Sequence, residues 1–145
     1  MPLNSFNVGS DCRVVVQHSL APGGQLSLGD VTSFKSEQQT KSLNYTRIDG
    51  VTKKAEYPTG WSGSFQLERT DHAVDDFICT LEQAILNNQP VSGATIYQYI
   101  TELDGSTSTY QFTGVALKMS DAGTYAGAET VKQTLNFEAS TRVKV

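Results

Sequence analysis

The chain has 145 residues, of which 38% are hydrophobic and 18% are charged, and its formal net charge is −4. This length suits one domain with its own core, so we expect residues 1–145 to form a single domain. The basic residues gather no more densely than the pair Lys53-Lys54, which argues against a protein that grips nucleic acid through its phosphates.

The first part of the chain predicts an arm, a strand and a turn. Residues 1–11 are rich in turn-forming residues, and we expect an N-terminal arm that Phe6 and Val8 could tether. Arg13–Ser19 is rich in β-branched residues and predicts a strand. Ala21–Gly24 has the glycines and proline of a turn.

A long extended region follows the turn. Residues 26–39 predict a second strand with a bend at Gly29-Asp30. Residues 40–59 are mostly polar and contain Asp49-Gly50, the strongest hairpin signal in the chain. We therefore expect residues 40–59 to form a long hairpin or loop that projects from the domain.

The hydrophobic period changes at Thr70, where a predicted strand gives way to a predicted helix. Before Thr70 the residues alternate in period two, with Trp61, Gly63, Phe65 and Leu67 on one face and Ser62, Ser64, Gln66 and Glu68 on the other. After Thr70 the apolar residues follow the spacing of one helical face: Val74, Phe77, Ile78, Leu81 and Ile85. We expect a helix at about 71–88 that covers an open side of the β-structure. Thr70 or Asp71 could cap its start.

Two more strands are predicted after the helix. Ala94–Glu102 and Thr109–Met119 flank the turn Leu103–Ser106, which contains a second Asp-Gly pair. The apolar phase of the second strand slips by one residue at Gly114, which predicts a β-bulge there.

The chain is expected to end on a loop and an alternating strand. Asp121–Gly127 predicts the loop, and Thr130–Thr141 predicts the last strand. Its inward residues are Val131, Leu135, Phe137 and Ala139, and its outward residues are Lys132, Thr134, Asn136, Glu138 and Ser140. The whole order predicts a mainly β (α+β) protein, an antiparallel β-sandwich or barrel-like domain with one flanking helix.

Candidate chemical groups are few. His72 and Asp76 are four residues apart on the helix and could serve acid–base or metal chemistry, but an acidic helix start explains them better. We expect His18 to lie on a solvated strand edge. We also expect no enzyme and no cofactor, and we expect Cys12 and Cys79 to be free thiols, with one disulfide as the alternative.

The sequence also lacks features of exported and membrane proteins. It shows no charged-then-apolar leader and no apolar run of about 18 residues, so we expect a soluble chain without an export signal. Five aromatic residues could instead form a stacking platform for sugars, although core packing explains them better: Trp61, Tyr97, Tyr99, Tyr110 and Tyr125. A carbohydrate-binding β-sandwich and a small hydrolase are therefore the alternative hypotheses.

Several motifs occur in an order that points to one family. They are Val31-Thr-Ser-Phe-Lys35, Asp49-Gly50, Pro58–Arg69 with Asp71 and Asp75-Asp76-Phe77 after it, Tyr110-Gln-Phe-Thr-Gly-Val115 and Val131–Ala139. Over residues 25–142 this layout resembles the tail tube proteins of tailed bacteriophages, particularly those with contractile tails. Related inner tubes occur in type VI secretion systems and tailocins, although type VI tube proteins carry different local motifs.

The resemblance implies a structural role. Six copies would form a ring, rings would stack into a tube, and DNA would pass through the lumen without specific binding. The implied partners are further copies of the chain and the sheath, baseplate or initiator and terminator proteins of a tail. The implied location is the virion tail, assembled in the host cytoplasm, and the inner tube of a type VI or tailocin-like contractile injection system is the alternative within this class.

The resemblance also assigns surfaces. We expect the projecting segment to contact the next ring through Asn44, Tyr45, Arg47, Asp49, Lys53, Lys54 and Tyr57. Two faces are candidates for the lumen: Ser62, Ser64, Gln66 and Glu68, or Lys132, Thr134, Asn136 and Glu138. In the second face, Glu138 or a neighbouring subunit would balance Lys132.

We further expect the ring to close through strand edges. The last strand is expected to be one of these edges. All four prolines, Pro2, Pro22, Pro58 and Pro90, lie outside the predicted strands, so the edges are weakly protected.

Overall fold

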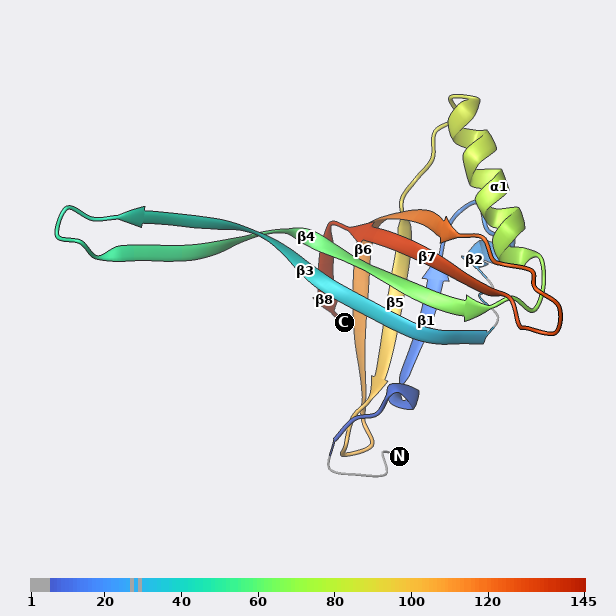
Figure 1. The fold of residues 1–145 in the computed structure, drawn as a ribbon, viewed down its shortest axis with the longest axis horizontal. Helices are drawn as coiled ribbons and strands as arrows, with labels where there is room; N and C mark the ends of the chain where they lie inside the picture. Colours follow the sequence, from blue (N-terminus) through green and yellow to red (C-terminus); the bar gives the residue numbers. More distant parts are fainter. Residues whose placement is uncertain (1–5, 27, 29) are drawn as a thin grey trace.

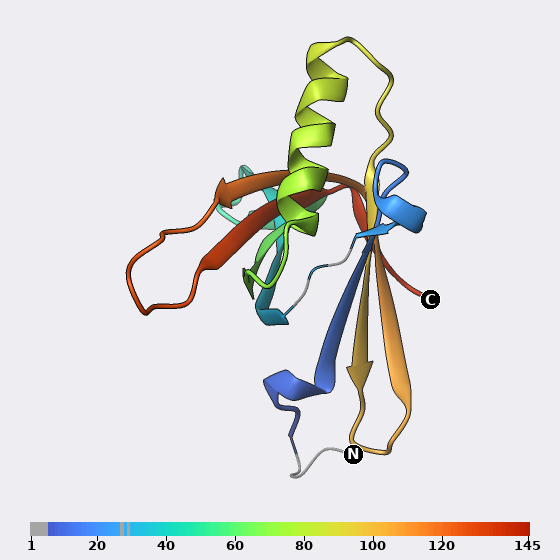
Figure 2. The same ribbon diagram turned by 90° about the vertical axis from the view of Figure 1, so that its right-hand side faces the viewer.

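Two groups of antiparallel strands cross at a large angle and share one strand (Figures 1 and 2). The computed structural model describes residues 6–26, 28 and 30–145. In this part of the chain the strands are β1 (Cys12–Gln17), β2 (Gln25–Leu26), β3 (Asp30–Thr46), β4 (Thr52–Glu68), β5 (Ala94–Thr101), β6 (Thr107–Asp121), β7 (Lys132–Ala139) and β8 (Thr141–Lys144), and the α-helix is α1 (Ala73–Leu86). The predicted mainly β fold with one flanking helix is confirmed.

The strand order is β2-β1-β5-β6-β7-β4-β3, with β8 also paired to β6. Each pairing is antiparallel. The path begins at β2 and ends at β3, so among the described residues the sheet is open rather than a closed barrel.

Strand β6 belongs to both groups because it bends at the predicted bulge. Ala94 lies opposite Val115 while Ile96 lies opposite Phe112, so β6 holds one extra residue there. Gly114 has a φ of +62°, a left-handed conformation that glycine adopts without the penalty of a Cβ. The half of β6 before the bulge pairs with β5, and the half after it pairs with β7.

The end of the chain differs from the single predicted strand. β7 stops at Ala139, and β8 begins at Thr141 and pairs with the first half of β6. The kink at Ser140 lets the chain follow β6 around its bend. Val131 precedes β7, and the first buried residue of the strand is Gln133. β7 also lies between β4 and β6, so the expectation that the last predicted strand is an edge strand is wrong.

The core lies where the two groups of strands face each other, and it is largely aromatic. Phe112 is fully buried, and its ring centroid lies 5.5 Å from that of Phe137 and 6.1 Å from that of Phe34. Phe34 stacks on Phe137 at 5.6 Å, and Trp61 meets Phe112 edge-on at 6.2 Å. These residues come from both groups of strands, so the cluster fixes one group against the other.

The helix packs on this core through residues between Val74 and Leu81. Val74 and Phe77 are buried, and Ile78 and Leu81 are partly buried and pack against the core. Ile85 is 57% exposed, so its predicted place among the buried residues is wrong. The physical reason is visible in Figures 1 and 2, where the C-terminal end of α1 extends beyond the sheets. No helix in the described part of the chain has the length and apolar character needed to cross a membrane.

Hydrogen bonds from residues close in the sequence mark both ends of α1. Asp71 accepts a hydrogen bond from the backbone N–H of Ala73 (3.0 Å), although it precedes the N-cap position, which His72 occupies. Asn88 ends the helix with a φ of +57°, and the N–H of Gln89 donates to the carbonyl of Ala84 (2.9 Å). A left-handed Asn with such a bond is a common helix terminator.

The β3–β4 hairpin projects far from the rest of the protein (Figure 1). The last pair between β4 and β7 is Trp61 with Ala139, and beyond it β3 and β4 pair only with each other. Pro58 lies inside β4, so the expectation that no proline falls in a strand is wrong. β4 has a single neighbour at Pro58, which also lies beside a register shift at Gln39/Thr40, and such positions tolerate a missing N–H donor.

Part of the N-terminal arm is described. The side-chain amide of Asn7 donates to the carbonyl of Thr101 (2.9 Å), and Asp11 accepts from the N–H of Val8 (2.9 Å). Phe6 is 61% exposed, so Asn7 rather than Phe6 fastens this segment to β5. Residues 1–5 of the predicted arm and Gly29 of the predicted bend lie outside the described residues.

Candidate functional site

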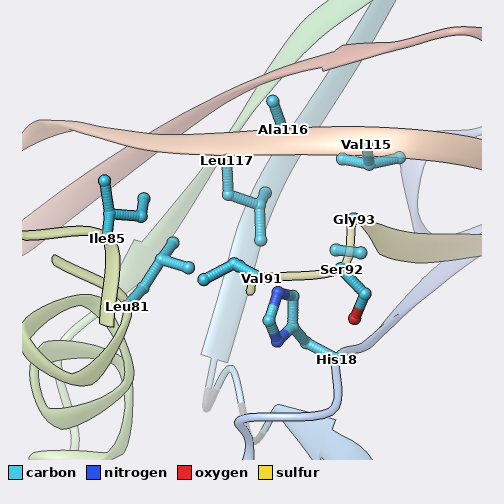
Figure 3. Close-up of a pocket in the computed structure, with 10 residues that line it drawn as sticks. His18, Leu81, Ile85, Val91, Ser92, Gly93, Val115, Ala116 and Leu117 are labelled. Atoms are coloured by element: carbon cyan, nitrogen blue, oxygen red, sulfur yellow. The ribbon is translucent and has the colours of Figure 1, made fainter. Parts of the chain in front are cut away.

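An apolar groove of about 310 Å3 lies between α1 and β6 and contains one of the two histidines (Figure 3). It is lined by His18, Leu81, Ile85, Val91, Ser92, Gly93, Ala94, Val115, Ala116 and Leu117. His18 is 6% exposed, so the expectation of a solvated strand edge is wrong. Its ring meets Phe77 edge-on at 5.1 Å, and its Nδ1 accepts a hydrogen bond from the N–H of Leu20 (3.0 Å).

The groove does not look like a catalytic site. Burial lowers the pKa of His18, and a backbone hydrogen bond with Ser92 opposes this shift only in part. No carboxylate, thiol or amine is present among the lining residues, so His18 has no partner there for acid–base chemistry. We conclude that His18 is a neutral packing residue beneath the helix.

The buried histidine predicts acid sensitivity. The folded state resists protonation of His18, while the unfolded state binds the proton at the ordinary pKa near 6.5. The free energy of unfolding should therefore fall as the pH drops below about 6.5, and the loss should end below the depressed folded pKa. Urea unfolding of the wild type and of His18→Gln between pH 7.5 and about 5.5 measures this difference.

A second histidine must be controlled in that experiment. Asp76 raises the pKa of the exposed His72, and this pair stabilises the folded state increasingly as the pH falls toward 6.5. The comparison is therefore made in a His72→Gln background. Parallel pH profiles with and without His18 would contradict the assignment.

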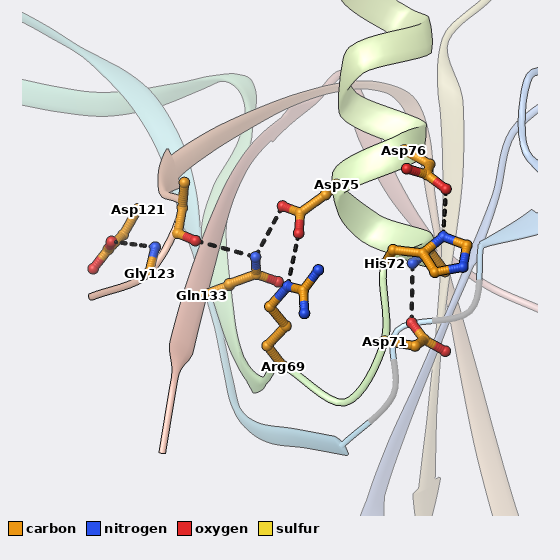
Figure 4. A network of polar contacts seen from close by, with 10 residues as sticks. Arg69, Asp71, His72, Asp75, Asp76, Asp121, Gly123 and Gln133 are labelled. Carbon is orange, nitrogen blue, oxygen red and sulfur yellow. Dashed lines mark hydrogen bonds and ion pairs between the residues drawn. The ribbon is translucent and has the colours of Figure 1, made fainter. Parts of the chain in front are cut away.

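A polar network joins the start of α1 to the sheet (Figure 4). Asp75 accepts from Arg69 Nε (2.8 Å) and from Gln133 Nε2 (2.9 Å), so both its carboxylate oxygens are occupied. Gln133 is 1% exposed and also donates to the carbonyl of Ala122 (3.1 Å). His72 and Asp76 form a separate exposed pair. Among the described residues no group of three potential metal ligands occurs, and the network serves to dock the helix.

The five aromatic candidates do not form one platform. Trp61 packs in the core, with the Arg142 guanidinium 5.1 Å from its ring and 4.0 Å from that of Tyr110. Tyr97 and Tyr99 stack at 6.4 Å, and Tyr125 is exposed on the β6–β7 loop. A sugar-binding surface built from these rings is therefore not favoured.

The two candidate lumen faces prove to be one surface. β4 and β7 are neighbours, and their outward residues lie opposite each other in the pairs Ser62–Glu138, Ser64–Asn136, Gln66–Thr134 and Glu68–Lys132. The strands are far apart in sequence, so only their pairing reveals the continuous surface. We call these eight residues, with Lys35, Glu37 and Lys118 beside them, the polar face.

The polar face carries no net positive charge. It holds three lysines and three glutamates: Lys35, Lys118, Lys132, Glu37, Glu68 and Glu138. The same ladders place Asp30 opposite Glu68 and Asp121 opposite Thr134, which makes the surroundings slightly acidic. Lys35 pairs with Glu37 at 2.8 Å. Glu68 lies directly across from Lys132, whereas Glu138, the predicted partner, lies at the other end of β7. Facing charges of opposite sign keep the surface polar without making it a phosphate-binding patch.

The hairpin has two chemically different faces. Residues directly opposite each other in a ladder share a face, and faces alternate along the strand. One face, the aromatic-basic face, contains the pairs Lys41–Tyr57, Leu43–Ala55 and Tyr45–Lys53. The other, the hydroxyl face, contains the pairs Thr40–Pro58, Ser42–Glu56, Asn44–Lys54 and Thr46–Thr52.

The hydroxyl groups and the carboxylate of the hydroxyl face bond to one another, and Asn44 and Lys54 lie between these bonds. Glu56 accepts from the hydroxyls of Thr40 and Ser42, both at 2.8 Å, and these bonds lower the pKa of its carboxyl group. Thr46 and Thr52 bond across the ladder at 3.2 Å. On the aromatic-basic face Tyr45 and Tyr57 are 63% and 62% exposed. Apart from Ile48 and Val51 at the tip, the large exposed apolar side chains of the hairpin are thus gathered on one face.

The seven predicted contact residues all lie on this hairpin but are divided among its surfaces. Tyr45, Lys53 and Tyr57 share the aromatic-basic face, and Asn44 and Lys54 lie on the hydroxyl face. At the tip Arg47 pairs with Asp49 (2.6 Å). Lys41, Leu43, Ile48 and Val51 are also exposed on this hairpin and were not among the predicted contact residues. The alternation on either side of Asp49-Gly50 could have identified Lys41 and Leu43.

Two strand edges near the polar face lack a neighbour within the described chain. β3 pairs with β4 alone, and Ala116–Asp121 of β6 pairs with β7 alone. These edges bound the four-strand group β3-β4-β7-β6 on its two sides. Unpaired edges of this length are pairing sites for another chain.

Comparisons with known proteins show the fold. No protein-family model matches the sequence, and no curated protein matches it either. Among solved structures, a chain of the anti-feeding prophage tube-terminating cap is similar with a TM-score of 0.63 and 12% identity, over 98% of this chain and 93% of that one. A chain of an extracellular contractile injection system, the PVC sheath-tube complex in its extended state, gives 0.62 and 11%, over 97% and 93%.

A third similarity extends to a different kind of particle. A chain in the tail of an empty gene transfer agent particle, refined with C6 symmetry, gives a TM-score of 0.57 and 9% identity, over 97% of this chain and 99% of that one. The protein therefore has the fold of chains found in contractile injection systems and phage-like tails, along nearly its whole length.

Proposed function

We propose that this protein is the structural subunit of a tail tube, in which six copies close a ring and rings stack around a lumen that DNA traverses. The observation that carries the proposal is the pair of free edges on β3 and on Ala116–Asp121 of β6. A fold shared with chains of tube complexes and of a six-fold symmetric tail supports it. The proposal assigns the chain no catalytic role.

The directions of the edge strands suit a ring. In the series β3-β4-β7-β6 each strand is antiparallel to the next, so the two outer strands, β3 and β6, run in opposite directions. If two copies related by rotation stand side by side, β3 of one meets β6 of the next as an antiparallel pair. Repeating this contact closes a ring through a heterologous interface, and the polar face then lies on one continuous surface of it.

The polar face is the proposed lumen lining. Each free cation on a lining would bind DNA phosphates by releasing counterions, and a ring would multiply this effect. Three lysines balanced by three glutamates avoid such binding. The proposed partners are further copies of the chain, then the sheath, baseplate and terminator proteins of a tail, and the proposed location is the tail, with assembly in the host cytoplasm.

A pair of proline substitutions tests ring closure. In a strand, successive N–H groups point to opposite edges, so of Glu37→Pro and Gln38→Pro one removes a donor to β4 and the other removes a donor on the free edge. Both residues are exposed. We expect one variant to keep its circular dichroism spectrum and melting temperature but to lose ring formation in sedimentation velocity. Normal rings from both folded variants would contradict edge pairing.

A second candidate is the inner tube of an injection system that carries no genome. It is favoured by the similarity to chains of the anti-feeding prophage and of the PVC system. Nucleic-acid content distinguishes the two candidates. Particles that contain this chain and package DNA support the tail-tube proposal, and particles that assemble fully without DNA support the injection system.

A further inference from the structure

Each of the two free edges runs beside a groove. The apolar groove of Figure 3 includes Ala116 and Leu117, which lie at the free edge of β6, and we call it the helix groove. A second groove, of about 590 Å3, runs between β1 and β3 and includes residues of the free edge of β3. We call it the strand groove, and it is lined by Gly9, Cys12, Arg13, Val14, Val31, Thr32, Ser33, Phe34 and Gln98.

Both grooves lie on the side of the strands that is turned away from the polar face. Leu117 of the helix groove lies opposite the buried Phe137, and Phe34 of the strand groove lies opposite the buried Phe65. Directly opposed residues share a face, so Leu117 and Phe34 point toward the core side. When β3 of one copy pairs with β6 of the next, the two grooves therefore meet on the outer side of the ring wall, behind the proposed lumen lining.

The elements beside the grooves extend past the free edges in opposite directions. In Figure 1 the C-terminal end of α1 extends beyond β6, on the side of the four-strand group away from β3. Strands β1 and β5 and the first half of β6 extend beyond β3 on the other side. A copy placed edge to edge thus brings the end of its α1 to the strand groove of its neighbour.

The end of α1 and the strand groove have complementary surfaces. Ile85 and Leu86 are 57% and 66% exposed, so the helix ends in apolar surface that its own chain leaves open. Val14 and Phe34 in the strand groove are apolar and only partly buried. The helix contains three carboxylates and no lysine or arginine, whereas Arg13 supplies the one charge among the described residues that line the strand groove. Apolar area and opposite charge therefore favour the same contact.

Resting on the proposed function, we propose that the C-terminal end of α1 seats in the strand groove of the neighbouring copy in the same ring. The helix then covers the core of two chains, its own through Phe77 and the neighbour's through Ile85 and Leu86. Paired strand edges contribute backbone hydrogen bonds but little apolar area, and a specific interface buries apolar area at its centre. The helix contact supplies that area, and it fixes the register in which the two edges pair.

A disulfide between copies tests this contact directly. Cys12 lines the strand groove, and both cysteines are free thiols. In a Cys79→Ser chain, we introduce either Ile85→Cys or Leu86→Cys and oxidise the assembled rings with diamide. At least one of these chains should give a ladder of up to six linked copies on a non-reducing gel, because a disulfide forms where the two Cα atoms lie within about 7 Å.

Two controls accompany the cross-linking. Adding Cys12→Ser to the same chain should abolish the ladder, since the introduced thiol then has no partner in the strand groove. Tyr125→Cys in the Cys79→Ser chain places a thiol on the β6–β7 loop at a similarly exposed position, and it should give single chains.

Truncation of one helix side chain tests what the contact contributes to assembly. Leu86→Ser should leave the melting temperature of the dilute chain unchanged, because Leu86 is exposed there. It should raise the protein concentration at which rings form in sedimentation velocity at least about tenfold, since a few buried anchors dominate an interface. Leu103→Ser makes the same change at an exposed leucine of the β5–β6 turn, and it should stay within about twofold of the wild type.

The outcomes separate the helix contact from the proposed function. The contact requires both a ladder from at least one helix position and weaker ring formation by Leu86→Ser, and the absence of either overturns it. If the wild type still forms rings in that case, the tube proposal stands on edge pairing alone. A ladder that ends at two chains, or that survives Cys12→Ser, also contradicts the assigned contact. If the wild type forms no rings under any condition, the proposed function fails, and this inference fails with it.

Discussion

We expect a chain in which a two-residue Asn-Gly turn replaces residues 40–59 to fold as the wild type does and to form no tubes. Gln39 and Gly60 lie opposite each other, so a short hairpin turn can join them. The side-chain hydrogen bonds of the removed residues all join residues of the hairpin itself, so the deletion leaves no partner behind in the domain. Because the deleted segment is exposed throughout, its removal exposes no core residue.

Two measurements decide this prediction. Thermal unfolding should give a melting temperature within a few degrees of the wild type, and electron microscopy should show single rings without stacks. The matched control shortens another hairpin by replacing Leu103–Ser106 between β5 and β6 with the same turn, which should leave tube growth normal. Tubes of ordinary length from the chain without residues 40–59 would exclude the hairpin as a stacking contact.

We expect Phe112→Ala to cause the largest loss of stability of any single change considered. Phe112 is fully buried in the half of β6 that pairs with β5, yet its ring touches Trp61, Phe34 and Phe137 from the other group of strands. Truncating a buried phenylalanine to alanine typically costs about 3–5 kcal/mol through lost burial and the cavity left behind. That loss is a large part of the stability of an ordinary domain.

Urea denaturation measures the effect as a lower midpoint at unchanged slope. Tyr125→Ala is the control, since its ring is 70% exposed and its loss should cost less than about 0.5 kcal/mol. A Phe112→Ala variant that loses under about 1 kcal/mol would show that the two groups of strands are not held by this cluster. The same variant should assemble poorly, because the position of one free edge relative to the other depends on the core.

Local signals predicted the elements that depend on neighbouring residues. Period-two alternation identified β7 and the second half of β4, from Trp61 to Glu68, and the change of period at Thr70 located α1 to within two residues. Asp49-Gly50 lies at the tip of the hairpin, and the phase slip at Gly114 marks the observed bulge. Each of these features is specified by residues within a few positions of it.

Features that depend on distant residues could not be predicted in the same way. His18 is buried because α1, which follows some sixty residues later in the chain, lies over it. Ile85 is exposed because the C-terminal end of α1 extends beyond the sheets. The polar face joins strands whose pairing is visible only in the fold. Pro58 fits inside β4 because β7 has already ended there. In each case the burial or pairing of the residue depends on a segment that is distant in the sequence, so the local pattern could not predict it.

The central claim is that the chain assembles through its own edges into rings and tubes. The most direct test is negative-stain electron microscopy of the purified full chain over a rising concentration series, with sedimentation velocity on the same samples. The account predicts six-membered rings that stack into hollow tubes. A chain that stays monomeric at high concentration, and that enters no tube when a tail-initiation complex is supplied, would contradict it.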